Sequence, residues 1–137
     1  MFKGIPSKNV ISARGIFPNA GGDPICCWLT DDAVFQISTP ASATQVLFVV
    51  VVPDLRVLHR VRRALTVNVN GKPAGNFDLK FGSSTLTVPL HPAGMHPAEN
   101  HGTAVEFKAR FSFVPKTEHL NGDTRKLSII LRSLRAE

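Results

Sequence analysis

Three histidines and one glutamate lie in a single stretch of the chain that is rich in proline and glycine. They are His91, His96, His101 and Glu99. Zinc sites combine imidazoles with carboxylates or thiolates, and paired ligands commonly lie two to five residues apart on a turn or helix. The five-residue steps between these histidines match no familiar zinc motif. We therefore expect an ordinary exposed loop, without a bound metal ion or another cofactor.

The chain lacks the residue arrangements that are typical of enzymes. We find no serine–histidine–aspartate order of a hydrolase, no glycine-rich phosphate loop and no HExxH helix. Cys26 and Cys27 are adjacent, and the separation that a disulfide requires makes a bond between neighbours rare, so we expect two reduced thiols. Nothing near Cys26 supplies a base that would activate it. The sequence predicts a noncatalytic protein, and a stoichiometric bound metal would favour an enzyme instead.

The densest group of positive charges comprises Arg56, His59, Arg60, Arg62 and Arg63. The whole chain has a formal net charge of +6 and a pI near 9.9, which favours polyanionic partners. Nucleic-acid modules usually place exposed aromatic rings among such residues for base stacking, and this group has none, so a nucleic-acid partner is not expected. Two interpretations stay open. The arginines Arg56, Arg60, Arg62 and Arg63 form either a solvated basic face or a contact for an acidic protein, an anionic glycan or lipid headgroups.

A single tryptophan and several short polar side chains are the candidates for carbohydrate binding. Carbohydrate recognition commonly uses an exposed aromatic ring beside polar groups. The chain has one tryptophan and no tyrosine. Its position just before an apolar segment favours a place in the core over an exposed platform. If a sugar binds, the candidate residues are Trp28, Asp31, Asp32, Asn68 and Asn70.

Asp123 and Arg125 precede the alternating segment that closes the sequence. Residues two apart in an extended segment point to the same side, so the two charges can pair with each other. One interpretation is structural, with Arg125 tying this turn to an adjacent loop. The other is that the guanidinium of Arg125 binds a sugar hydroxyl or a carboxylate.

Short strands are expected to position these candidates. The chain contains segments in which apolar and polar residues alternate, as in strands, and its ten glycines and ten prolines separate these segments. The segment 104–113 is the clearest. It places Val105, Phe107, Ala109, Phe111 and Phe113 on one side. The predicted strands are 33–38, 45–53, 65–70, 76–81, 85–90, 104–113 and 126–134, with 9–12 and the region of Trp28 as further candidates. About eight strands predict an all-β fold, a two-sheet antiparallel sandwich of jelly-roll type.

Two local features refine this prediction. Asn70-Gly71 follows an alternating segment and is typical of a hairpin turn, with 76–81 as the returning strand. The segment 54–64 has apolar residues at helical spacing and predicts one or two helical turns.

The length of 137 residues predicts one domain, 1–137, around one core. With 43% hydrophobic residues the chain can bury enough apolar surface to fold unaided. The most apolar run, 46–52, is far shorter than the roughly 18 residues of a membrane-spanning helix, and the N-terminal segment lacks a signal-peptide core. We therefore expect no transmembrane segment and a cytoplasmic location.

A series of short motifs spans the chain from Gly15 to Leu134. In order they are GIFP at 15–18, WLTDDA at 28–33, VNVNG at 67–71, LTVPL at 86–90, FVP at 113–115, and DTRKLSI at 123–129 with LRSL at 131–134. Together they resemble the small jelly-roll accessory module that accompanies bacterial glycosyltransferases, and some methyltransferases, of cell-surface polysaccharide synthesis. The resemblance implies a noncatalytic module associated with carbohydrate.

The leading hypothesis from the sequence is a noncatalytic β-sandwich that binds carbohydrate or docks onto a glycan-synthesis protein. The alternative is an interaction or assembly module, including a homo-oligomer, that uses an exposed strand edge or the basic face.

Overall fold

The computed structural model describes residues 10–17, 28–38, 42–90, 103–114, 117 and 126–137, with only the backbone of residues 10–13 and 17. Within these ranges the strands pair antiparallel throughout, and the single helical element is a short 3-10 helix, η1. The all-β antiparallel prediction is confirmed. The elements are β1 (Val10–Phe17), β2 (Trp28–Ile37), β3 (Gln45–Val52), η1 (Arg56–Arg60), β4 (Ala64–Val69), β5 (Lys72–Asp78), β6 (Gly82–Pro89), β7 (Thr103–Ala109) and β8 (Ile130–Ala136).

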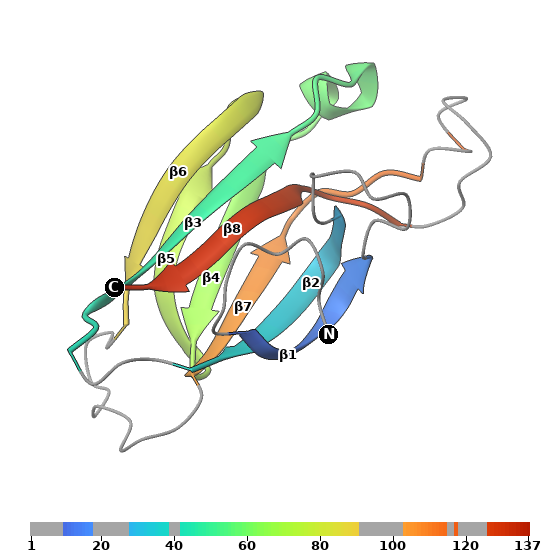
Figure 1. The fold of residues 1–137 in the computed structure, drawn as a ribbon. Helices are drawn as coiled ribbons and strands as arrows, with labels where there is room; N and C mark the ends of the chain where they lie inside the picture. Colours follow the sequence, from blue (N-terminus) through green and yellow to red (C-terminus); the bar gives the residue numbers. More distant parts are fainter. Residues whose placement is uncertain (1–9, 18–27, 39–41, 91–102, 115–116, 118–125) are drawn as a thin grey trace.

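The strands form the two layers of a sandwich (Figure 1). One layer has the order β5-β4-β7-β2, with β1 paired along β2, and the other has the order β8-β3-β6. Neighbouring strands are often distant in the chain, as β2 and β7, β3 and β8, and β3 and β6 are. This order gives the protein a jelly-roll-like sandwich, as the sequence predicted.

The two layers are joined at a corner where β2 meets the entry to β8. Residues 32–37 of β2 pair with β7, whereas Trp28 at its start pairs with Ile130 of β8. The fully buried Ser128 stabilises this corner. Its N–H donates to the carbonyl of Leu29 over 2.8 Å, and its hydroxyl lies 2.7 Å from the carbonyl of Thr30. Strands that pass from one sheet to another commonly do so at such bends.

Gly15 lies on β1 opposite the bend of β2. The register is irregular at this point, because Arg14 lies opposite Val34 and Ile16 lies opposite Leu29. Gly15 has a φ of +74°, and a Cβ there would lie 2.3 Å from the backbone oxygen of Asp32. Only glycine fits both the left-handed backbone and the close approach of β2.

Phenylalanine rings fill the space between the layers. The ring of Phe107 on β7 lies edge-on to those of Phe35 on β2 and Phe48 on β3, at centroid distances of 5.7 and 5.1 Å. Phe48 also meets Phe77 of β5 at 6.0 Å. The predicted inner side of segment 104–113 is confirmed. Its buried members are Val105, Phe107, Ala109, Phe111 and Phe113.

The hairpin predicted at Asn70-Gly71 is confirmed. Both residues have positive φ, +49° and +81°, which is the backbone of a two-residue hairpin turn. Because Val69 then lies opposite Lys72, β5 begins directly after the turn rather than at the predicted residue 76. Pairing with β4 outweighs the low strand propensity of the intervening proline and glycine.

Further segments differ from the sequence prediction in length. The predicted strands 33–38 and 85–90 begin earlier, at Trp28 of β2 and Gly82 of β6, and the predicted strand 104–113 ends at Ala109 of β7. The helical spacing of 54–64 produces only η1. The closing strand begins at Ile130, because the preceding residues 127–129 form the corner and are buried on all sides. Alternation therefore stops before the strand starts. No helix in the described part of the chain is long and apolar enough to cross a membrane.

Candidate functional site

The outer side of the five-stranded layer is polar. Its side chains alternate along each strand with those of the core, so they point away from the opposite layer. Strand register places Lys108 between Asp32 and Thr66, and Glu106 between Val34 and Asn68. We call this surface the polar face. It comprises Arg14, Asp32, Thr66, Asn68, Asn76, Asp78, Glu106, Lys108 and Arg110.

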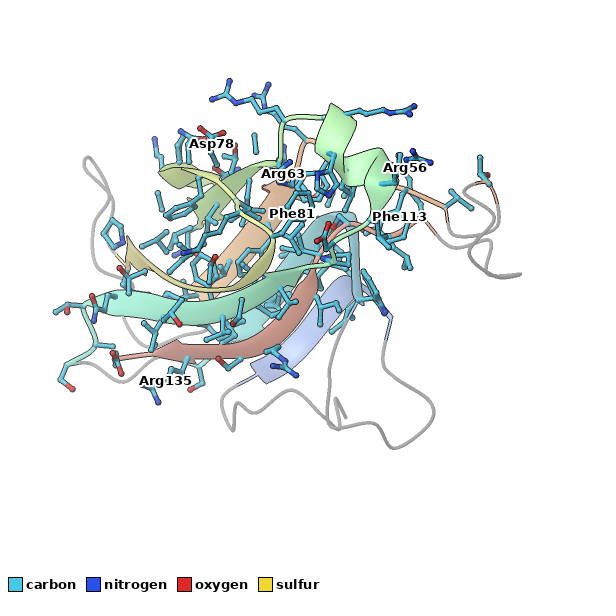
Figure 2. The ribbon with its side chains drawn as sticks, turned by 90° about the horizontal axis from the view of Figure 1, so that it is seen from above. Arg56, Arg63, Asp78, Phe81, Phe113 and Arg135 are labelled. Atoms are coloured by element: carbon cyan, nitrogen blue, oxygen red, sulfur yellow. The ribbon has the colours of Figure 1, made fainter. Side chains whose placement is uncertain are left out.

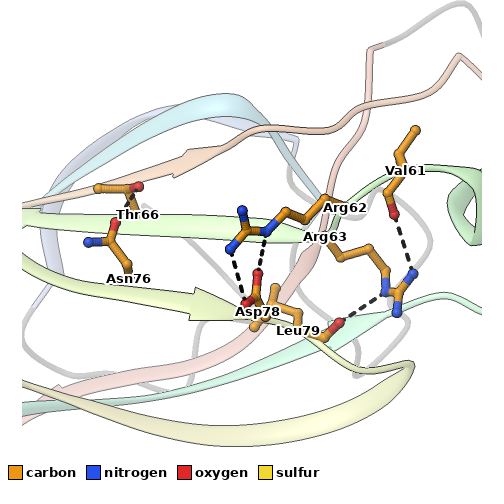
Figure 3. Close-up of polar contacts among 7 residues, drawn as sticks. All are labelled: Val61, Arg62, Arg63, Thr66, Asn76, Asp78 and Leu79. Atoms are coloured by element: carbon orange, nitrogen blue, oxygen red, sulfur yellow. Dashed lines mark hydrogen bonds and ion pairs between the residues drawn. The ribbon is translucent and has the colours of Figure 1, made fainter.

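A hollow of about 460 Å³ opens where the polar face reaches the start of β4 and the end of β5. We call it the β4–β5 groove. Its volume lies in the range of about 300–1,000 Å³ that is usual for small-molecule sites. Figure 3 shows several of the polar side chains around it. The groove is lined by Arg62, Thr66, Asn76, Asp78 and Arg110, with Val61, Ala64, Leu65 and Phe77.

Two side-chain pairs shape the groove. Arg62 donates through Nε and Nη2 to both oxygens of Asp78, at 2.9 and 3.3 Å, and these hydrogen bonds lower the pKa of Asp78. The hydroxyl of Thr66 donates to the side-chain oxygen of Asn76 over 2.8 Å. Arg110 is exposed and has no side-chain hydrogen bond or ion pair with the described residues. The groove thus presents one paired guanidinium and one that is available to a ligand.

A carboxylate pair continues the polar face beyond the groove. Asn68 donates to Glu106 over 3.1 Å, and Asp32 hydrogen-bonds to Glu106 from the neighbouring strand. Burial, then the hydrogen bond and the negative charge of Glu106, raise the pKa of Asp32. Burial also raises the pKa of Glu106, but hydrogen bonds from Asn68 and Asp32 and the charges of Lys108 and Arg14 bring it below its ordinary value. Asp32 therefore holds its proton more tightly than Glu106 does.

Asp32→Asn is expected to raise the free energy of unfolding near pH 7 by about 0.2–0.5 kcal/mol, a small gain because the site is largely solvent-exposed. A carboxyl whose pKa is raised on folding stabilises the fold while it is protonated, and this stability is lost as the pH rises through the raised value. Asparagine keeps a donor for Glu106 and carries no charge. Urea unfolding of both proteins at several pH values measures the difference.

The gain should shrink as the pH falls and Asp32 of the wild type becomes protonated. Asp31→Asn is the matched control, because Asp31 pairs with Lys126 at 3.1 Å and does not meet Glu106. A variant less stable than the wild type near pH 7 would show that attraction to Lys108 and Arg14 outweighs the repulsion from Glu106.

The structure brings only two of the predicted carbohydrate residues together. Asp32 and Asn68 come together on the polar face, joined through Glu106. Trp28 is half-buried at the corner, with its ring edge-on to Phe113 at 5.8 Å. The remaining three are placed elsewhere: Asp31 pairs with Lys126, Asn70 accepts a hydrogen bond from the N–H of Ala104 at the hairpin, and Arg125 lies outside the described residues.

The four arginines of the predicted basic face are in different environments, and Figure 2 labels two of them, Arg56 and Arg63. Arg63 donates to the carbonyls of Leu79 and Leu58 at 2.9 and 3.0 Å, and its guanidinium lies 4.1 Å from the centroid of the Phe81 ring. Arg63 therefore connects η1 to the residue that follows β5. Arg62 forms the groove pair with Asp78, whereas Arg56 and Arg60 are exposed on η1.

Several predicted features fall outside the described ranges. They are the cysteines Cys26 and Cys27, the loop residues His91, His96, Glu99 and His101, and the pair Asp123 and Arg125. Within the described ranges, no group of three or more histidine, cysteine, aspartate or glutamate residues could hold a metal ion.

Sequence reasoning missed most of the groove. Thr66, Asn76, Asp78 and Arg110 come from three separate segments, and none belongs to a recognisable motif. The available signal was their outward position in alternating strands. That signal marks each residue as exposed, but it does not show that the strands which carry them are neighbours.

The fold and the groove define an antiparallel jelly-roll-like sandwich with a polar hollow on one layer. Among solved structures, the chain is similar to a family 35 carbohydrate binding module from an environmental isolate. The TM-score is 0.53 with 14% sequence identity, over 96% of this chain and 88% of that one, a likeness in fold alone. No protein-family model and no curated protein sequence matches the chain.

Proposed function

We propose that this protein is a noncatalytic carbohydrate-binding module and that the sugar binds in the β4–β5 groove. The observation that carries the proposal is the groove itself, a hollow bordered by a hydroxyl, an amide, a carboxylate and two guanidinium groups. The similarity in fold to a carbohydrate binding module supports it.

The groups around the groove suit the chemistry of a sugar. Each sugar hydroxyl both donates and accepts hydrogen bonds, so a site that holds it needs donors and acceptors side by side. Asn76 supplies both from one amide, Asp78 accepts at two oxygens, and Arg110 donates in a planar fork. Because the Arg62–Asp78 and Thr66–Asn76 pairs are already formed, Asp78 and Asn76 are positioned before a ligand arrives.

The polar face extends the proposed site. Asn68 and Glu106 follow Thr66 and Lys108 along the same outer side of β4 and β7. An oligosaccharide whose first unit occupies the groove would reach them with its next units. Asn68 and Asp32, two of the residues predicted from the sequence, then contribute to the same binding surface.

Arg110→Ala is expected to weaken oligosaccharide binding about 10- to 100-fold, because a hydrogen bond that involves a charged group contributes about 1.5–3 kcal/mol. A glycan array with the folded wild type selects the probe. Calorimetric titration of that oligosaccharide then gives both dissociation constants. Arg132→Ala is the matched control, since Arg132 is an exposed arginine on β8 in the opposite layer.

Equal affinity of the Arg110→Ala variant and the wild type would place the sugar elsewhere on the protein. If no glycan binds the folded protein at millimolar concentration, carbohydrate binding itself is wrong.

We further propose that the protein acts in the cytoplasm, beside the enzymes of glycan synthesis. The motifs that resemble the accessory module of glycosyltransferases support it. In that role the module would hold a growing glycan while a separate enzyme acts on it. Co-purification of a glycosyltransferase with the tagged protein tests this part independently of the sugar titration.

A further inference from the structure

The strand β6 forms one end of the sheet and has a free edge. It pairs with β3 along its whole length, from Gly82 opposite Val52 to Pro89 opposite Gln45, and with no other strand of the described chain. A hollow of about 480 Å³ separates residues 83–86 of β6 from residues 76–80. Among the residues that the structure describes, nothing pairs with the outer edge of β6, so this edge can accept another strand.

The sequence of β6, GSSTLTVP, contains no charged residue. Edge strands are commonly protected by lysine, proline or bulges against pairing with other chains. The other sheet end, β5, has such protection, with Lys72, Pro73, Asp78 and a register shift opposite Val67 and Asn68. Proline occurs in β6 only at the last residue, Pro89. Seven consecutive residues of β6 thus lack the usual protection.

The direction of each backbone group follows from the antiparallel pattern. The N–H of Leu90 donates to the carbonyl of Thr44, and Val46 pairs with Val88 two residues further along. Hydrogen-bonded pairs alternate with non-hydrogen-bonded pairs in an antiparallel ladder. The even-numbered residues of β6 therefore bond to β3. The backbone groups of Ser83, Thr85 and Thr87 point to the free edge.

A second copy of β6 is self-complementary to this edge. In an antiparallel pair centred on Thr85, Thr85 lies opposite Thr85 of the second copy and Ser83 lies opposite Thr87. Every outward N–H and carbonyl of these residues then has a partner. Because β6 is uncharged, the two-fold symmetry places no like charges opposite each other.

We propose that this protein forms a symmetric dimer in which β6 pairs antiparallel with β6 of a second copy. The β8-β3-β6 layers of the two copies then form one continuous sheet. The β4–β5 groove belongs to the other layer, but it shares Asn76, Phe77 and Asp78 with the hollow beside β6.

Thr85→Pro tests the proposal, because proline removes the outward N–H at the centre of the pair, and edge strands tolerate proline where this group faces solvent. Light scattering after size exclusion, over a range of concentrations, should give a dimer for the wild type and for the neutral control Thr85→Val. For Thr85→Pro, loss of the two central hydrogen bonds should raise the dimer dissociation constant about 5- to 100-fold.

A charge exchange provides a second test that does not depend on tolerance of proline. Thr85→Lys and Thr85→Glu each place like charges opposite each other in a homodimer, so each variant alone should dissociate more readily. An equimolar mixture should restore a dimer that contains one copy of each. A wild-type monomer at millimolar concentration would overturn the proposal, as would a dimer that these substitutions leave unchanged.

Discussion

Phe107→Ala is expected to lower the free energy of unfolding by about 3–5 kcal/mol, the usual cost of truncating a buried phenylalanine. The side chain is 1% exposed, and its ring contacts Phe35 in its own layer and Phe48 in the other. Alanine would leave a cavity at the point where the layers meet. Urea unfolding followed by circular dichroism measures the loss.

Phe107→Leu is the matched control, because leucine retains most of the volume and should cost about 1–1.5 kcal/mol. A loss below about 1 kcal/mol for Phe107→Ala would indicate that the core is not closed around this ring. The arrangement of the two layers would then need revision.

Gly15→Ala is expected to lower the free energy of unfolding by about 2–4 kcal/mol, through backbone strain and a steric clash. The new Cβ would lie 2.3 Å from the carbonyl oxygen of Asp32 and 2.9 Å from the Cα of Ala33. Both are backbone atoms of β2, so the strand itself must move. Thermal and urea unfolding measure the loss, and slowed pairing of β1 with β2 would accompany it.

Gly82→Ala separates the two contributions. Gly82 also has a positive φ, +90°, but no heavy atom lies within 4 Å of a Cβ placed there. Its substitution should therefore show strain alone, about 1 kcal/mol. Equal losses at both glycines would mean that the close approach of β1 to the bend of β2 is absent in solution.

Much of the architecture could be predicted from the sequence because one physical signal dominates it. Alternation along segment 104–113 identified the inner side of β7 and of the residues that follow it. The Asn70-Gly71 sequence identified the hairpin turn, in which both residues have positive φ. Alternation of apolar and polar residues fails to predict a strand where both sides of the backbone are buried. At residues 127–129 the corner encloses the chain on all sides, so three consecutive residues are buried and the strand begins later than expected.

The candidate site was less accessible to prediction, because it depends on which strands are neighbours. Asp32, Asn68 and Glu106 are far apart in the sequence and meet only because β7 lies between β2 and β4. Arg63 illustrates the opposite case. Its position in a basic cluster suggested a solvated face or an anion contact, but its guanidinium donates to backbone carbonyls, which no local pattern of charge can reveal.

The position of β8 has a consequence for how the protein reaches its fold. β8 lies between β2 and β3, and its residues pair with a strand made much earlier, as Ala136 does with Val46. During synthesis the apolar β3 therefore lacks one neighbour until residues 130–136 leave the ribosome. Contacts between such distant residues make folding slow, and an exposed apolar strand can aggregate meanwhile. Chaperone binding to the incomplete chain would protect this strand.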